Sequence, residues 1–187
     1  MPFYKTGRGR KLAEWLTHEE MDMMYKAADN VRDLMLIYFA YYTGFRAAEV
    51  SNCQVKDISW TEGTIKVRQG KGSKDRIIAM HSNLKILMEQ WLKSVKENPE
   101  TYIFPGTKGK GITTRQIYGI VSKTSKRTEI KKKVHPHTLR HTIAMHLFKD
   151  GKSMVVISRF LGHASIATTQ IYADADVNDQ IEMMSKF

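Results

Sequence analysis

The sequence predicts an α+β domain that is mostly helical and carries one small three-stranded antiparallel sheet. Two observations lead to this fold class. Segments on both sides of the chain's middle show helix signals, namely capping residues and apolar residues at helical spacing. Between them, residues 55–80 form short β-type segments separated by glycine-containing turns. Runs of helices with one small sheet are typical of the α+β class.

The first helices are defined by their ends. Thr17 and Glu20 have the spacing of a capping box, so a helix is expected to start there. A second helix, over residues 31–43, is almost wholly apolar and should be central. Gly44 suits its C-cap, which would let a new short helix begin over residues 46–53.

Three short strands are expected next, over residues 55–60, 64–68 and 76–80. Glu62-Gly63 is a turn signal between the first two strands. Gly70-Lys71-Gly72-Ser73 is a looser turn between the second and the third.

Helices then return in four segments, residues 83–97, 113–126, 137–149 and 153–161. A short turn carrying Tyr172 and a terminal helix over residues 177–187 are expected to follow. On that last helix Val177, Ile181 and Met184 fall on one face, which must be buried somewhere.

The composition favours a nucleic-acid partner. The 187 residues most simply form one domain, in which 30 Lys and Arg outnumber 19 Asp and Glu for a net charge of +11. A domain this basic usually meets a polyanion, although charge that only aids solubility is the alternative. Residues 123–133 hold six basic side chains, which form either a phosphate-contacting face or a solvated loop.

Cysteine use and hydropathy indicate a cytoplasmic protein. Cys53 is the only cysteine, so an internal disulfide is impossible and a reducing setting is expected. The longest apolar run, Leu34 to Tyr42, is too short to span a bilayer, and no signal peptide opens the chain. No membrane partner is expected.

Six residues in five segments carry the functional signal, and Glu49 accompanies them. In order and local context they resemble the active-site set of the tyrosine recombinases, the phage-integrase family. The segments are Thr43-Gly44-Phe45-Arg46-Ala47-Ala48-Glu49, Gly70-Lys71-Gly72, His137-Thr138-Leu139-Arg140-His141, Leu161-Gly162-His163, and Tyr172 nine positions after His163.

The resemblance gives the arginines a role that their chemistry suits. Cleaving a DNA phosphodiester without a metal needs a nucleophile, positive charge on the non-bridging oxygens and an acid for the leaving oxygen. The family pattern implies that Arg46 and Arg140 clamp the scissile phosphate, since a guanidinium can bond two oxygens at once. Glu49 would orient its basic neighbours. The alternative for Arg46 is a surface i,i+3 salt bridge to Glu49.

Lys71 and His137 are implied to move protons. By resemblance Lys71 protonates the departing 5′ oxygen, with Lys74 close by as the alternative. His137 handles the tyrosine proton and faces the same way as Arg140 on their helix. The spacing of His137 and His141 also suits a zinc site, but no Glu follows the first His and no third ligand is evident. We therefore expect no metal and no cofactor.

His163 and Tyr172 complete the set. The resemblance implies that His163 hydrogen-bonds the scissile phosphate, whereas a lone His at a helix end is more often a cap or dipole partner. Tyr172 would be the nucleophile. A phenol with a pKa near 10 needs a neighbouring base and positive charge to attack at neutral pH.

The resemblance implies a site-specific recombinase or integrase. Such enzymes hold one DNA strand as a 3′-phosphotyrosine, and the 5′-hydroxyl of a partner strand then attacks the adduct. Double-stranded DNA is the expected partner, with self-association on DNA, location at the nucleoid and a prokaryotic or viral origin. The alternatives are a type IB topoisomerase, a transposase of the same family and a DNA-binding module that no longer cuts.

The expected domain division is a basic arm over residues 1–15 and a recombinase catalytic domain over residues 16–187. Family members usually carry a separate N-terminal core-binding domain, which we expect to be absent here. The chain would then be either an excised fragment or a minimal enzyme, with sequence-specific DNA binding weakened more than the chemistry.

Overall fold

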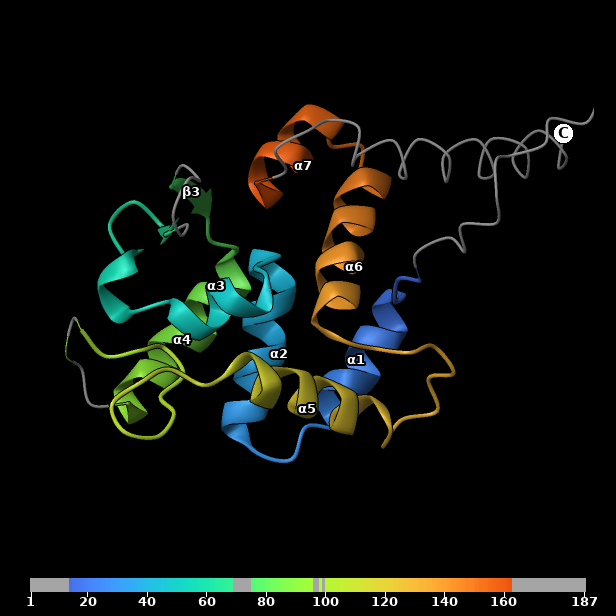
Figure 1. Ribbon diagram of the computed structural model, residues 1–187. Coiled ribbons are helices and arrows are strands. Elements are labelled where there is room, and N and C mark those ends of the chain that lie inside the picture. Colours follow the sequence, from blue (N-terminus) through green and yellow to red (C-terminus); the bar gives the residue numbers. More distant parts are fainter. Residues whose placement is uncertain (1–13, 69–74, 96–97, 99, 163–187) are drawn as a thin grey trace, which may run out of the picture.

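The computed structural model describes residues 14–68, 75–95, 98 and 100–162 (Figure 1). The elements within these ranges are α1 (His18–Lys26), α2 (Val31–Thr43), α3 (Ala47–Asn52), the 3-10 helix η1 (Val55–Asp57), β1 (Ile58–Ser59), β2 (Thr64–Val67), β3 (Arg76–Ala79), α4 (Ser82–Ser94), α5 (Thr114–Ser125), α6 (Pro136–Lys149) and α7 (Met154–Leu161). The predicted fold class, mostly helical with a small three-stranded antiparallel sheet, is confirmed.

Helix α2 forms the centre of the core, as its apolar sequence predicted. It packs against α6 and α4, and Figure 1 shows α2 in the middle of the molecule. Phe39 is fully buried, with its ring edge-on to the rings of Phe45 and Phe104. None of the helices in the described ranges is long and apolar enough to cross a membrane.

Gly44 turns the chain sharply between α2 and α3. Its φ of 59° lies in the left-handed region, which a glycine adopts without steric cost. A Cβ at this position would lie 2.7 Å from Cδ2 of Leu161, so only a glycine lets the turn approach α7 this closely. The turn leaves Arg46 as the N-cap residue of α3.

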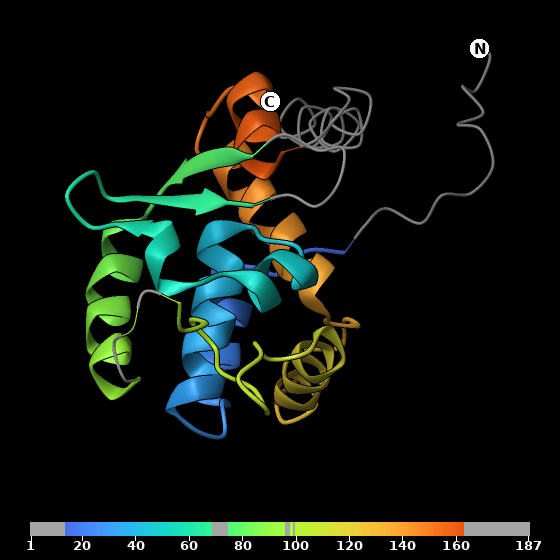
Figure 2. The ribbon, with the colours of Figure 1, turned by 60° about the vertical axis from the view of Figure 1, so that its left-hand side comes forward.

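The sheet has the order β1-β2-β3 with antiparallel pairing throughout. Ile65 in β2 lies opposite Ile58 and Ile78, and these three side chains are buried on one face. Lys66 and Ile77 point the other way and are exposed, which is the alternation expected of a half-buried sheet. Figure 2 shows β2 and β3 side by side, with β3 next to α7.

The strand predicted over residues 55–60 was only partly right. The structure has the 3-10 helix η1 over Val55–Asp57, and only Ile58–Ser59 pairs as β1. The Asp57 carboxylate accepts the backbone N–H of Gln54 at 2.9 Å, so a side chain satisfies this donor and the chain curls before the sheet begins.

Helices α6 and α7 follow each other closely in the chain and pack against each other. Helix α6 begins at Pro136, a favoured first helical residue that lacks the N–H a helix start would leave unpaired. Helix α7 lies across one end of α6, on the side of β3 (Figure 1). It ends at Gly162, whose φ of 68° is again left-handed.

Candidate active site

Three arginines from separate segments meet at the C-terminal end of α7. The last carbonyls of a helix have no partner within the helix and carry the negative end of its dipole, so they attract cations. Here three successive carbonyls each accept a hydrogen bond from a different guanidinium. The bonds run from Arg76 Nε to the Phe160 oxygen (3.1 Å), from Arg140 Nη2 to the Leu161 oxygen (2.7 Å) and from Arg46 Nη2 to the Gly162 oxygen (3.2 Å).

Arg140 is held rigidly. The residue is buried, with 6% of its surface exposed, and Nη1 also donates to the backbone oxygen of Gly44 at 2.5 Å. A buried cation is tolerated only when polar groups solvate it, and two carbonyl oxygens do so here. The Arg140 guanidinium is therefore fixed between the turn after α2 and the end of α7.

Arg46 is more open and is held by Glu49. Its Nη1 donates to Glu49 Oε1 at 2.9 Å and its backbone N–H donates to Oε2, also at 2.9 Å. The i,i+3 salt bridge considered as the alternative for Arg46 therefore exists. However, 39% of the Arg46 side chain remains exposed against 9% for Glu49, so solvent still reaches the guanidinium.

Glu49 has a second cationic partner, Arg76, which no sequence motif marks. Arg76 Nη1 and Nη2 donate to the two carboxylate oxygens at 3.0 and 2.9 Å. Burial alone would raise the pKa of Glu49, but the hydrogen bonds from Arg76 and Arg46 outweigh it and lower that pKa. Glu49 is therefore an anion shared between two arginines.

His137 lies exposed in the first turn of α6, with its ring edge-on to the rings of Tyr118 and His135. Its pKa is lowered, first by loss of water around the ring, and then by the positive charges of His135, Arg140 and Arg46. A lowered pKa keeps the imidazole neutral at pH 7, so that His137 can accept a proton.

Three of the predicted site residues, Lys71, His163 and Tyr172, lie outside the described residues, as does the alternative Lys74. The predicted terminal helix over residues 177–187 lies there too. The structure thus brings Arg46, Glu49 and Arg140 together, places His137 where the charges of both arginines act on it, and leaves the other three positions as predictions.

Other candidate chemistry is absent from the described part of the chain. There, no three His, Cys, Asp or Glu side chains gather as a metal site would require. Cys53 is buried as a free thiol, and burial raises its pKa, which disfavours the reactive thiolate.

The basic segment 123–133 is partly neutralised by ion pairs within the protein. Lys123 and Arg127 both pair with Asp29, and Lys132 pairs with Glu20. These contacts fasten the segment to the N-terminal helices. The three remaining basic residues, Lys126, Lys131 and Lys133, are exposed.

Comparisons with known proteins agree with the resemblance. The model of the phage integrase family matches residues 14–179. A tyrosine recombinase of Pseudothermotoga lettingae is 33% identical over 178 residues, covering 95% of this chain and 62% of the relative. Tyrosine recombinase XerC of Thermodesulfovibrio yellowstonii is 35% identical over 190 residues, covering 95% of this chain and 63% of the relative.

Solved structures share the fold. The crystal structure of XerA recombinase superposes with a TM-score of 0.80 at 31% identity, covering 94% of this chain and 66% of that one. XerH site-specific recombinase, in a post-cleavage complex with palindromic difH substrate, has a TM-score of 0.77 at 25% identity, covering 96% and 55%. The fold is that of a tyrosine recombinase catalytic domain. The chain spans less than two thirds of the length of these relatives.

Proposed function

The chain belongs to the phage integrase family, and from this premise we propose that it is a site-specific DNA recombinase that cuts and rejoins strands through a 3′-phosphotyrosine. One observation carries the proposal. Arg46 and Arg140, which are far apart in the sequence, converge at the end of α7, and the charges of both act on His137. In the sequence this end directly precedes His163 and lies ten residues before Tyr172.

The proposed reaction uses positive charge in place of a metal ion. Arg46 and Arg140 stabilise the charge that develops on the non-bridging phosphate oxygens, and His163 adds a further hydrogen bond. Their guanidiniums are already held by backbone carbonyls and by Glu49, so little reorganisation is needed when phosphate arrives.

Proton transfer falls to His137, Lys71 and Tyr172. The neutral imidazole of His137 accepts the phenol proton as the Tyr172 oxygen attacks phosphorus. Lys71 protonates the 5′ oxygen as its bond to phosphorus breaks. The bond between phosphorus and the 5′ oxygen breaks as a bond between phosphorus and the Tyr172 oxygen forms, so the number of phosphate ester bonds is unchanged. The reverse attack by a 5′-hydroxyl reseals a strand.

The proposed partner is double-stranded DNA, and we place the catalytic domain at residues 16–187, preceded by a basic arm over residues 1–15. XerH recombinase, a structural relative, was solved with its difH substrate, which supports the choice of DNA. Self-association on DNA and location in the cytoplasm at the nucleoid remain part of the proposal. The apolar stripe of Val177, Ile181 and Met184 is the proposed contact between protomers.

Covalent capture on DNA tests the proposal. A nicked duplex that loses a short 5′-hydroxyl fragment after cleavage should trap the chain as a denaturation-resistant adduct, with EDTA present throughout. Arg140→Lys should slow adduct formation about a hundredfold, the scale expected for losing a transition-state donor. A chain that binds the duplex without forming any adduct would instead be a DNA-binding module.

A further inference from the structure

Resting on the proposed function, we propose that Arg76 is a positioning residue that balances the charge of Glu49 and so keeps Arg46 aimed at the scissile phosphate. Arg76 begins β3 and does not face the solvent as a strand-edge arginine usually does. Only 10% of its side chain is exposed, and its guanidinium lies 5.7 Å from the centre of the Phe45 ring. Such burial indicates a specific role for its charge.

Arg76 changes the net charge of the group that surrounds Glu49. Glu49 alone would cancel the charge of Arg46, because an arginine and a carboxylate 2.9 Å apart form a neutral pair. Arg76 supplies a second cation to the same carboxylate. Two guanidiniums and one carboxylate together carry one net positive charge, which is available to a phosphate only at the exposed member, Arg46.

Arg76 also fixes the orientation of the Glu49 carboxylate. Each Glu49 oxygen accepts one hydrogen bond from Arg46 and one from Arg76, at 2.9 to 3.0 Å. A bidentate guanidinium fixes the plane of the carboxylate, and the carboxylate in turn fixes Arg46. A lysine could supply the charge but could not hold both oxygens.

Arg76 also contacts the end of α7, where Arg46 and Arg140 bind. Its Nε donates to the Phe160 carbonyl in the last turn of α7, next to the carbonyls that Arg140 and Arg46 hold. The backbone of Gly162 packs so tightly on Arg76 that an added Cβ would lie 2.9 Å from its guanidinium. Arg76 thus joins β3, α3 and the end of α7.

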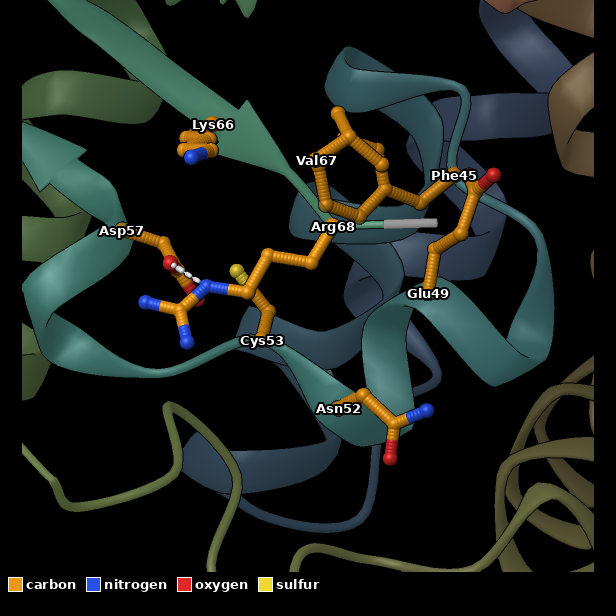
Figure 3. Close-up of a pocket in the computed structure, with 8 residues that line it drawn as sticks. All are labelled: Phe45, Glu49, Asn52, Cys53, Asp57, Lys66, Val67 and Arg68. Atoms are coloured by element: carbon orange, nitrogen blue, oxygen red, sulfur yellow. Dashed lines mark ion pairs between the residues drawn. The ribbon is translucent and has the colours of Figure 1, made fainter. Parts of the chain in front are cut away.

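Arg68 offers a matched control in the same sheet. It follows β2 and pairs with the buried carboxylate of Asp57 at 2.6 Å. Figure 3 shows the Arg68 guanidinium turned toward Asp57, while the Glu49 side chain points away from it. Arg68→Gln therefore removes an arginine–carboxylate pair without touching the one that holds Arg46.

The test measures adduct formation in a single turnover at saturating protein, together with DNA affinity and Tm. We expect Arg76→Gln to lower the rate constant about tenfold or more, because a misplaced positioning group is costly even at full binding. Arg76→Lys should lose less, and Arg68→Gln should stay within about twofold of wild type. If Arg76→Gln does not fold, the rate of Arg76→Lys decides.

A double variant separates positioning from a general effect on stability. If Arg76 acts through Arg46, Arg46→Gln/Arg76→Gln should be no slower than Arg46→Gln alone. Additive losses, or an Arg76→Lys rate within about twofold of wild type, would overturn the inference. Wild-type protein that forms no adduct would overturn the proposed function itself, and this inference with it.

Discussion

Glu49 binds two arginines, and the second of them changes how the first is interpreted. The i,i+3 salt bridge to Arg46 is an ordinary helix contact, and by itself it would argue against a catalytic Arg46. The second cation, Arg76, changes that conclusion because it leaves the group with a positive charge. Under the proposed function, the role of Arg46 would therefore depend on a residue that the resemblance did not point to.

His137 gives a prediction about pH. Its pKa lies below 6.5, so the neutral form that accepts the tyrosine proton is lost as the pH falls through that lowered value. The second-order rate constant for adduct formation, which reports the free protein, should therefore be level near pH 7 and fall in acid. The folded state also binds this proton more weakly than the unfolded chain, so acid should cost stability as well.

The fall of the rate constant in acid, here called the acid limb, should depend on His137 and not on His81. The small residual rate of His137→Gln should no longer fall with acid, whereas His81→Gln, which changes an exposed residue that caps α4, should keep the limb. A limb that persists in His137→Gln would show that another group titrates.

At the scale of elements, the end of α7 is the feature around which the site is built. The turn after α2, the start of α3, the strand β3 and the second turn of α6 all supply donors or close contacts to it. Unpaired carbonyls at a helix end need partners, and arginines provide them here. The same interaction that stabilises the helix end therefore gathers the cationic groups.

Two glycines allow this arrangement to be tested. Gly151 and Gly162 both have left-handed backbones, with φ of 76° and 68°, but only an added Cβ at Gly162 would meet another group within 4 Å. Gly151→Ala should lower Tm by about 2–4 °C from backbone strain alone. Gly162→Ala should cost several degrees more and also slow adduct formation, because Arg76 must move. Equal losses of Tm would mean that Arg76 can move away from the added Cβ at no cost in stability.

The sequence was sufficient for elements whose signals are local. The ends of α2 were predicted from an apolar run followed by a glycine, and the start of α1 from its capping box. The first strand was overextended because the backbone contact of Asp57 competes with strand pairing. Strand propensity does not take account of hydrogen bonds between a side chain and the nearby backbone.

The candidate site was predictable only in part. Arg46 and Arg140 stand in recognisable motifs, and the structure brings them together as expected. Arg76 was assigned only as the start of a strand, since its partner Glu49 is 27 residues away and nothing local marks the pairing. Long-range ion pairs depend on the tertiary fold, so they are the part that pattern reading misses.

At the scale of the whole molecule, charge should dominate DNA binding. The chain carries +11, but Lys123, Arg127 and Lys132 are already paired with acidic side chains. The free energy of binding should therefore come from phosphate contacts made by the other basic residues, including those gathered at α7.

The affinity of this chain for DNA should accordingly fall steeply with salt. A plot of log K against log salt should be linear, with a slope of about −0.9 for each phosphate contacted. Competition between random and cognate duplexes should show a small specificity ratio. A ratio of roughly a thousand or more would mean that this chain alone reads bases as well as full specific binders do.

Peptide mapping of the trapped adduct shows which residue attacks the DNA, and Tyr172 is the residue expected. The wild-type adduct, formed in EDTA and digested with protease and nuclease, should yield one modified peptide with a 3′-linked nucleotide on Tyr172. Tyr172→Phe should give no adduct while its DNA affinity stays nearly unchanged, since only the attacking oxygen is lost. A nucleotide on any other residue, or an adduct of normal yield from Tyr172→Phe, would contradict the account.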